Sequence, residues 1–322
     1  MQGAILRPRQ RWLPGVFLVL VLLLSGCATQ THNLLQGRDA SIPPRQELVA
    51  TPFFPQELYQ CGPASLATVL QVAGVSATPE QLVSQVYIPE RQGSLQTEMI
   101  AAARRHGTLA VTIPPRLDAL LQEVANGTPV IVLQNLSLPV QPVWHYAVVI
   151  GYDLDRREVV LRSGTTEREV MPMRTFEHTW ARSNHWAMVA MPAGRLPATA
   201  AEDEVAPALV ALERVAKPEQ AHAAYAAALQ RWPDNLILLM GAGNAAYRMG
   251  KLDQAATALR RATTVHPDSA PAFNNLANVL IELGDYDSAR VAAERAVALG
   301  GQWSSAAQAT LETVRRRQMS GL

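Results

Sequence analysis

The chain has 322 residues, of which 48% are hydrophobic and 17% are charged, which is typical of a globular protein with about two domains. Its formal net charge is +1 and its acids and bases are interspersed. It therefore lacks the strongly basic domain or stripe that marks nucleic-acid binding, and we expect no nucleic-acid partner.

The first 27 residues carry three arginines, an apolar run over residues 16–24 and the box Leu24-Ser25-Gly26-Cys27. This pattern resembles a bacterial lipoprotein signal, which is cleaved after small residues so that the cysteine becomes the lipidated first residue. The run is shorter than the roughly 20 residues of a spanning helix, although an uncleaved anchor is the alternative. In the lipoproteins that the signal resembles, an Asp after the cysteine retains the protein at the inner membrane. Ala28 stands there, so the resemblance implies a lipid on Cys27 and the periplasmic face of the outer membrane.

The sequence then predicts a polar tether over residues 28–46, because this segment lacks periodicity and contains Pro43-Pro44. A domain follows over residues 47–195. Apolar spacing and end signals predict helices at residues 61–70, 79–83, 96–105, 116–125 and 173–183. Apolar runs predict strands at residues 129–133, 146–152, 158–161 and 186–191, the middle two forming an antiparallel hairpin. Helices followed by an antiparallel sheet indicate the α+β class.

The segment over residues 203–322 repeats itself. Ala221, Ala255 and Ala289 recur at intervals of 34 residues, and Pro233 and Pro267 have the same spacing. Small residues where paired helices touch, with Pro after the second helix, resemble tetratricopeptide repeats. We expect an all-α repeat solenoid with a capping helix over residues 302–317 and a surface for a protein partner. A generic Ala-rich bundle is the alternative.

Cys61 lies at the start of a predicted helix, where Gly62 and Pro63 suit the first turn. Unsatisfied N–H groups and the helix dipole at such a position favour the reactive thiolate. If Cys27 carries lipid, Cys61 has no partner for a disulfide, because the chain has only these two cysteines. The alternative is a small buried hydrophobe, the usual role of a free cysteine.

A nucleophilic thiol needs a base, a group that orients the base, and donors for the oxyanion. Of the seven histidines, His145 lies at the start of a predicted strand, whereas His106 and His178 lie on helical patterns. A helix-borne cysteine followed by a strand-borne histidine is the order of papain-like enzymes, although His145 could instead be a structural histidine. No second available cysteine and no His-x-x-x-His pair offer a metal site, so we expect no cofactor.

Three stretches carry a resemblance to the bacteriocin-processing cysteine peptidases, the double-glycine leader peptidases of the papain-like clan. They are Gln56, Cys61-Gly62-Pro63-Ala64 with its helix, and His145-Tyr146-Ala147-Val148-Val149 with Gly151-Tyr152. The resemblance covers residues 47–192 and implies a papain-like fold and a protein or peptide substrate. It makes Cys61 the nucleophile, His145 the general base and Gln56 the oxyanion donor. Gln60 competes for the last role, but it adjoins Cys61 and is less able to reach the same pocket.

One residue departs from the family, which places an Asp on the strand after the histidine strand. Hairpin pairing of Asp153 with Glu158 sets residues 163–166 beside the imidazole, while Asp153 itself is about 26 Å away along the strand. Ser163 therefore takes the place of the Asp. A hydroxyl can orient a histidine without stabilising its charge as a carboxylate would. Ser163 is either this orienting residue or an ordinary turn serine.

Two functions stay open. The first is a lipid-anchored cysteine peptidase whose repeats present protein substrates. The presence of Cys61, His145 and Gln56 favours it. The second is a non-catalytic periplasmic scaffold with a degenerate peptidase domain, which the missing Asp favours. A papain-like acyl transferase would use the same acyl-thioester with an amine as the acceptor.

Overall fold

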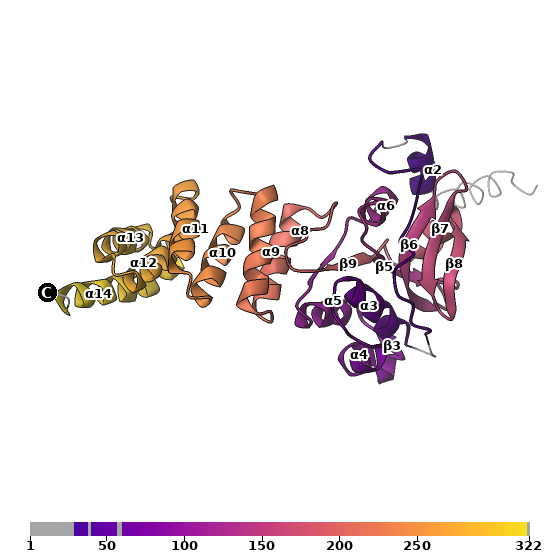
Figure 1. Cartoon of the computed structure of the whole chain (residues 1–322), viewed down its shortest axis with the longest axis horizontal. Coiled ribbons are helices and arrows are strands. Elements are labelled where there is room, and N and C mark those ends of the chain that lie inside the picture. The colour runs from indigo at the N-terminus through magenta and orange to yellow at the C-terminus, as the bar shows by residue number, and fades with distance from the viewer. Residues whose placement is uncertain (1–28, 38–39, 57–59, 321–322) are drawn as a thin grey trace, which may run out of the picture.

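The structure is a computed structural model that describes residues 29–37, 40–56 and 60–320. The expected signal over residues 1–27 and its lipid site, Cys27, lie outside the described residues. A sheet domain stands at one end of the molecule, and a row of helices extends from it to the C-terminus (Figure 1). No helix in the described part of the chain is long and apolar enough to cross a membrane.

The main sheet is antiparallel and has seven strands in the order β4-β9-β5-β6-β7-β8, with β1 paired to the end of β6. Its strands are β1 (Arg45–Glu47), β4 (Leu109–Thr112), β5 (Val130–Asn135), β6 (Trp144–Asp153), β7 (Glu158–Ser163), β8 (Thr166–Pro172) and β9 (Ala187–Met191). A second, two-stranded sheet pairs β2 (Tyr87–Ile88) with β3 (Gly93–Ser94). The predicted hairpin is confirmed as β6 and β7, in which Asp153 faces Glu158.

Helices cover both faces of the main sheet. They are α3 (Cys61–Val72), α4 (Pro79–Val86), α5 (Gln96–Arg105), α6 (Leu117–Ala125) and α7 (Met173–Ala181), with a 3-10 turn, η1 (Pro89–Arg91). Tyr146 and Val148 of β6 pack with α3, α4 and α5, whereas Ala147 and Val149 pack with α6 and α7. A strand buried on both faces has a nearly continuous apolar run, which is why β6 was visible in the sequence.

Some elements differ from the expectation. The sequence predicts a tether over residues 28–46, but the structure has helix α2 (Thr29–Gln36) and strand β1 there. Strand β8 was not predicted because it lies at the edge of the sheet and most of its side chains are exposed. Local patterns could not show either feature, since polar segments of this kind are held by distant parts of the chain.

Two buried glutamates fasten the chain on either side of the sheet domain. Glu177 of α7 accepts hydrogen bonds from the Gln30 N–H (2.9 Å), the Thr31 N–H (2.7 Å) and the Thr31 hydroxyl (2.5 Å), which binds α2 to the domain. Glu123 of α6 accepts from the Ala198 N–H (3.1 Å), the Thr199 N–H (2.8 Å) and the Thr199 hydroxyl (2.7 Å). The second contact fixes the segment that leads into the repeats. We call Glu123 and Glu177 the tie glutamates.

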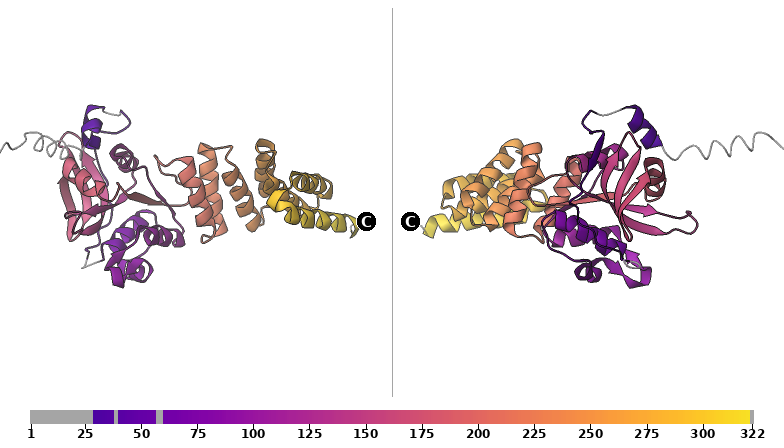
Figure 2. Two further views of the ribbon diagram at one scale, coloured as in Figure 1. Left: turned by 180° about the vertical axis from the view of Figure 1, so that it is seen from behind. Right: turned by 45° about the vertical axis from the view of Figure 1, so that its right-hand side comes forward.

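The C-terminal part is all α-helical. Its helices are α8 (Glu202–Glu213), α9 (Pro218–Arg231), α10 (Leu236–Arg248), α11 (Leu252–Val265), α12 (Ala270–Glu282), α13 (Tyr286–Leu299) and α14 (Ser304–Ser320), with a 3-10 turn, η2 (Gly301–Trp303). Ala221, Ala255 and Ala289 are all buried, as the repeat spacing predicts. The apolar core of the sheet domain continues through α8 and α9 into α10. The helices stack in a row beside the sheet domain (Figure 2).

Candidate active site

Cys61 is the first residue of α3, the helix that packs on β6. The next residue has to be small, because a Cβ on Gly62 would overlap the side chain of Ser94 on β3. The backbone at Cys61, Gly62 and Tyr146 favours the ionised thiol and acts to lower its pKa. The sulfur thus lies against β6 at the residue that follows His145.

The protonation of Cys61 differs from the expectation. The neighbouring N–H groups lower the pKa of the thiol, as a helix start should, but burial raises it by more and the net direction is upward. Apolar side chains of the α3 face of the sheet surround the half-buried cysteine. The resting group is therefore a thiol, and its reaction requires a base to remove the proton.

His145 lies at the start of β6, and its Nε2 is 3.0 Å from the Ser163 hydroxyl at the end of β7. A bulge between Val149 and Gly151 shifts the hairpin register, so that Val148 pairs with Arg162. Ser163 is 9% exposed and sits beside the imidazole, at the position that hairpin pairing predicts. Burial lowers the pKa of His145, while the charge of Glu169 on β8 acts in the opposite direction.

Gln56 joins this group from the segment before α3. Its backbone N–H donates to the Gly164 carbonyl (3.0 Å), and its side-chain carbonyl accepts from the Gly164 N–H (3.1 Å). Within the described part of the chain, its amide nitrogen makes only long contacts, to the Ser65 hydroxyl (3.4 Å) and to the Tyr146 carbonyl (3.5 Å). The amide donor therefore lies beside Ser65 of α3 and Tyr146 of β6 without being strongly engaged. Gln60 is the residue before α3 and makes no side-chain capping bond.

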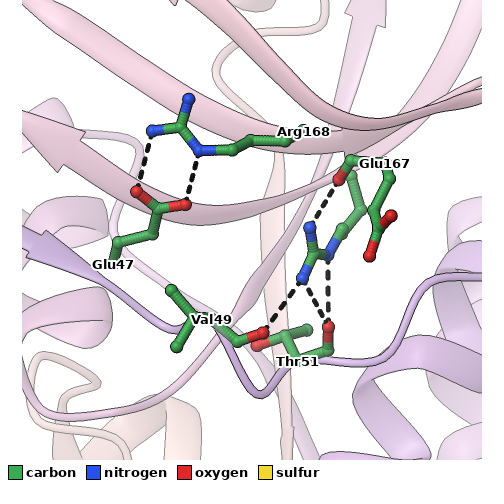
Figure 3. Close-up of polar contacts among 6 residues, drawn as sticks. Glu47, Val49, Thr51, Glu167 and Arg168 are labelled. Carbon is green, nitrogen blue, oxygen red and sulfur yellow. Dashed lines mark hydrogen bonds and ion pairs between the residues drawn. The ribbon is translucent and has the colours of Figure 1, made fainter.

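An arginine network holds the segment that leads to Gln56. Arg162 donates to the carbonyls of Val49, Thr51 and Glu167, and Arg168 forms a two-bond ion pair with Glu47 (Figure 3). Gly151 allows β1 to approach β6 beside this network, since a Cβ there would be 2.8 Å from the Gln46 carbonyl oxygen. These contacts fix residues 46–51 against the strands that carry His145 and Ser163.

The structure thus brings Cys61, His145, Ser163 and Gln56 to one end of the β6–β7 hairpin. Across the described ranges, no hydrogen bond joins the Cys61 thiol to the imidazole. Catalytic hydrogen bonds are often long without substrate and tighten when it binds. Because Nε2 faces Ser163, Nδ1 is the nitrogen left for the thiol. In the same part of the chain, no group of three or more His, Cys, Asp or Glu side chains could hold a metal ion.

Sequence reasoning missed Glu169. The short turn after Ser163 could have indicated another strand, because a hairpin at this turn would bring the following residues back along β7, one strand away from the histidine strand. The exposed, polar sequence of β8 concealed that strand.

Solved structures resemble each part of the chain. A crystal structure described as a C39-like peptidase from Bacillus anthracis is 20% identical, covers 46% of this chain and 98% of its own, and has a TM-score of 0.39. The Sgt2 TPR domain from Aspergillus fumigatus is 26% identical, covering 36% and 76%, with a TM-score of 0.32. The type III secretion translocator chaperone SycD from Yersinia enterocolitica is 17% identical, covering 35% and 83%, with a TM-score of 0.34. No curated protein sequence matches the chain.

Two protein families match the sequence itself. Residues 45–188 match the Peptidase_C39 like family, and residues 209–248 and 240–307 match the tetratricopeptide repeat. The first range runs from β1 to the start of β9, and the other two run from within α8 to the first turn of α14. The chain therefore consists of an N-terminal α+β domain that resembles C39-like peptidases, followed by tetratricopeptide repeats.

Proposed function

We propose that the protein is a lipid-anchored cysteine peptidase on the periplasmic face of the outer membrane, and that its repeats recruit a protein substrate or partner. The observation that carries the proposal is the gathering of Cys61, His145, Ser163 and Gln56 at the His145 end of the hairpin. Cys61 begins the helix that packs on β6, His145 Nε2 is 3.0 Å from the Ser163 hydroxyl, and Gln56 binds Gly164 next to Ser163. The match to C39-like peptidases supports the reaction class.

In the proposed reaction, His145 Nδ1 takes the thiol proton while the Cys61 sulfur attacks the carbonyl carbon of the scissile peptide bond. A C–S bond forms, and the electron pair of the carbonyl moves to its oxygen. The Gln56 amide and the N–H groups at the start of α3 donate to this oxyanion. The imidazolium then gives its proton to the leaving amine as the C–N bond breaks. Water hydrolyses the thioester with His145 as the base, which restores the thiol.

Hydrolysis of a quenched fluorescent peptide library tests this proposal. We expect Cys61→Ser and His145→Ala each to abolish cleavage by the purified full chain, because one removes the nucleophile and the other removes its base. His32→Ala is the matched control, since His32 is exposed on α2 and far from the site in sequence. Cleavage that survives Cys61→Ser would contradict the proposal.

A non-catalytic scaffold is the second candidate, and two observations favour it. Ser163 stands where the related peptidases have an Asp, and burial raises the pKa of the Cys61 thiol. A scaffold predicts that the wild-type chain cleaves no member of the library. A transferase predicts that added amines capture the acyl group faster than water does.

The membrane attachment rests on Cys27. Because α2 begins two residues after Cys27 and its first turn is bound to Glu177, a lipid there would hold the sheet domain close to the bilayer. We expect Cys27→Ala to yield an uncleaved or mislocalised precursor. Membrane fractionation checks this, and a processed mutant that stays in the outer membrane would argue against lipid anchoring.

A further inference from the structure

We propose that Glu169 is a positioning residue of the candidate active site, which supplies through space the negative charge that Ser163 lacks. The inference rests on the proposed peptidase function. It follows from the register of β7 and β8, which sets Glu169 on the same sheet face as Ser163 and His145.

The pairing of strands determines which side chains share that face. Leu161 of β7 is paired with Glu169 of β8, and Val159 is paired with Met171. Paired residues point to the same side of an antiparallel sheet, and so do residues two apart on one strand. Ser163 lies two residues beyond Leu161, so Glu169 is its diagonal neighbour, although an irregularity between Leu161 and Ser163 pairs Ser163 itself with Thr166.

Burial supports the assignment of the face. Val159 and Leu161 belong to the core on the α6 and α7 side, and Met171 packs against it. Ala147, two residues after His145, lies in the same core. Arg168 points the other way, to Glu47 of β1. Glu169 therefore lies on the His145 side of β8, whereas its neighbour in the chain does not.

Glu169 lies close enough to act on the imidazole through space. Diagonal neighbours in an antiparallel sheet have Cα atoms about 7 to 8 Å apart, so the Glu169 side chain can approach Ser163, whose hydroxyl is 3.0 Å from His145 Nε2. Strand β7 separates Glu169 from the histidine strand, so the carboxylate acts by its charge and not by contact. Glu169 is half-buried, and among the described residues no hydrogen bond or ion pair engages its carboxylate. Its charge is the one that raises the pKa of His145 against the effect of burial. An imidazolium formed by taking the Cys61 proton is stabilised by this carboxylate.

The other groups around His145 do not supply this charge. Gln134 of β5 is paired with His145 and is neutral, as is Ser163 of β7. The thiol of Cys61, at Tyr146, titrates itself and is the reaction partner. Glu169 of β8 thus supplies the negative charge that an Asp at the Ser163 position of β7 would supply.

Two measurements on the full chain test the role. The first is the NMR titration of the His145 imidazole, in a Cys61→Ser background so that thiol ionisation does not contribute. We expect Glu169→Gln to lower the pKa of His145, because the opposing charge is removed. The second is the rate at which iodoacetamide alkylates Cys61 at pH 7 in the chain with its cysteine, which should fall about threefold to tenfold.

Glu167→Gln is the matched control, because it removes the same charge from an exposed side chain on the same strand. It should leave both readouts unchanged. If Glu169→Gln leaves the titration of His145 and the alkylation rate at their wild-type values, the inference is overturned. A wild-type Cys61 that alkylates no faster than a free cysteine points instead to failure of the peptidase proposal.

Discussion

The tie glutamates and the candidate active site use polar groups in opposite ways. Glu123 and Glu177 are 0% and 2% exposed, and each carboxylate accepts three hydrogen bonds between 2.5 and 3.1 Å. At the site, the Gln56 amide nitrogen makes contacts of only 3.4 and 3.5 Å, and the half-buried Cys61 has no side-chain partner among the described residues. Saturated groups stabilise the fold, whereas the loosely engaged groups keep bonding capacity for a substrate.

The largest expected effect is on stability, at the ties. Glu123→Ala should lower the free energy of unfolding by about 1.5 to 4.5 kcal/mol, because the Ala198 N–H, the Thr199 N–H and the Thr199 hydroxyl lose their acceptor and each hydrogen bond contributes about 0.5 to 1.5 kcal/mol. Urea unfolding followed by circular dichroism measures this. Glu90→Ala, at an exposed glutamate of the same domain, is the control and should change little. If Glu123→Ala and Glu90→Ala unfold at the same urea concentration, Glu123 does not stabilise the fold and the contrast with the candidate active site is lost.

Gln56→Ala should reduce activity much more than stability, the opposite of Glu123→Ala. We expect hydrolysis to fall about a hundred- to a thousandfold, as on loss of one oxyanion donor. The unfolding midpoint should change less than in Glu123→Ala, because the donor contacts of the Gln56 amide nitrogen are long. Gln60→Ala is the control for the neighbouring amide. A larger loss of activity in Gln60→Ala would assign the oxyanion role to Gln60.

The buried alanines of the repeats differ from the tie glutamates and from the candidate active site because they act through apolar packing. Ala255→Leu or Ala289→Leu should destabilise the C-terminal helices by about 1 to 3 kcal/mol, because each alanine is 0% exposed at a helix contact and has no room for a larger side chain. Ala258→Leu, at a partly buried alanine of the same helix α11, should cost less. Urea unfolding compares the variants, and an unchanged midpoint for Ala255→Leu would count against the packing described for the repeats.

The smallest effects are expected at Ser163. Ser163→Ala should lower hydrolysis by less than about tenfold, because Glu169 still acts on the imidazole. Ser163→Asp, which introduces the residue that the resemblance to cysteine peptidases implies at this position, should preserve or raise the rate, since a carboxylate stabilises the imidazolium. Initial rates of the two variants test this. A rate in Ser163→Asp as low as in His145→Ala, with the fold intact, would show that this carboxylate does not serve the base.

Local patterns were sufficient for much of the fold and for the residues of the candidate site. Strands β5 and β6 could be predicted from their apolar runs, and the repeat helices from their regularly spaced small residues. In both cases the buried residues recur at short intervals along the chain. The hairpin register also placed Ser163 beside His145, even though the bulge near Gly151 was not predicted.

The remaining features depend on contacts between distant residues. Helix α2 is polar and is held by Glu177, 146 residues away from Thr31, so no local signal distinguishes it from a tether. Glu169 is one of several charges on an exposed strand, and only the pairing of β7 with β8 sets it on the His145 face. The pKa of Cys61 is raised because burial in the surrounding core raises it by more than the backbone at the helix start lowers it. The sequence shows the helix start but not the burial.

In the proposed reaction, His145 activates Cys61. The most direct measurement is the rate of iodoacetamide alkylation at pH 7, read by mass spectrometry on the peptide that contains Cys61, in the wild-type chain and in His145→Ala. We expect Cys61 to react at least about tenfold faster in the wild type, because only there is a base available for the thiol proton. Equal rates in the two chains would contradict it and would leave the sheet domain as a scaffold.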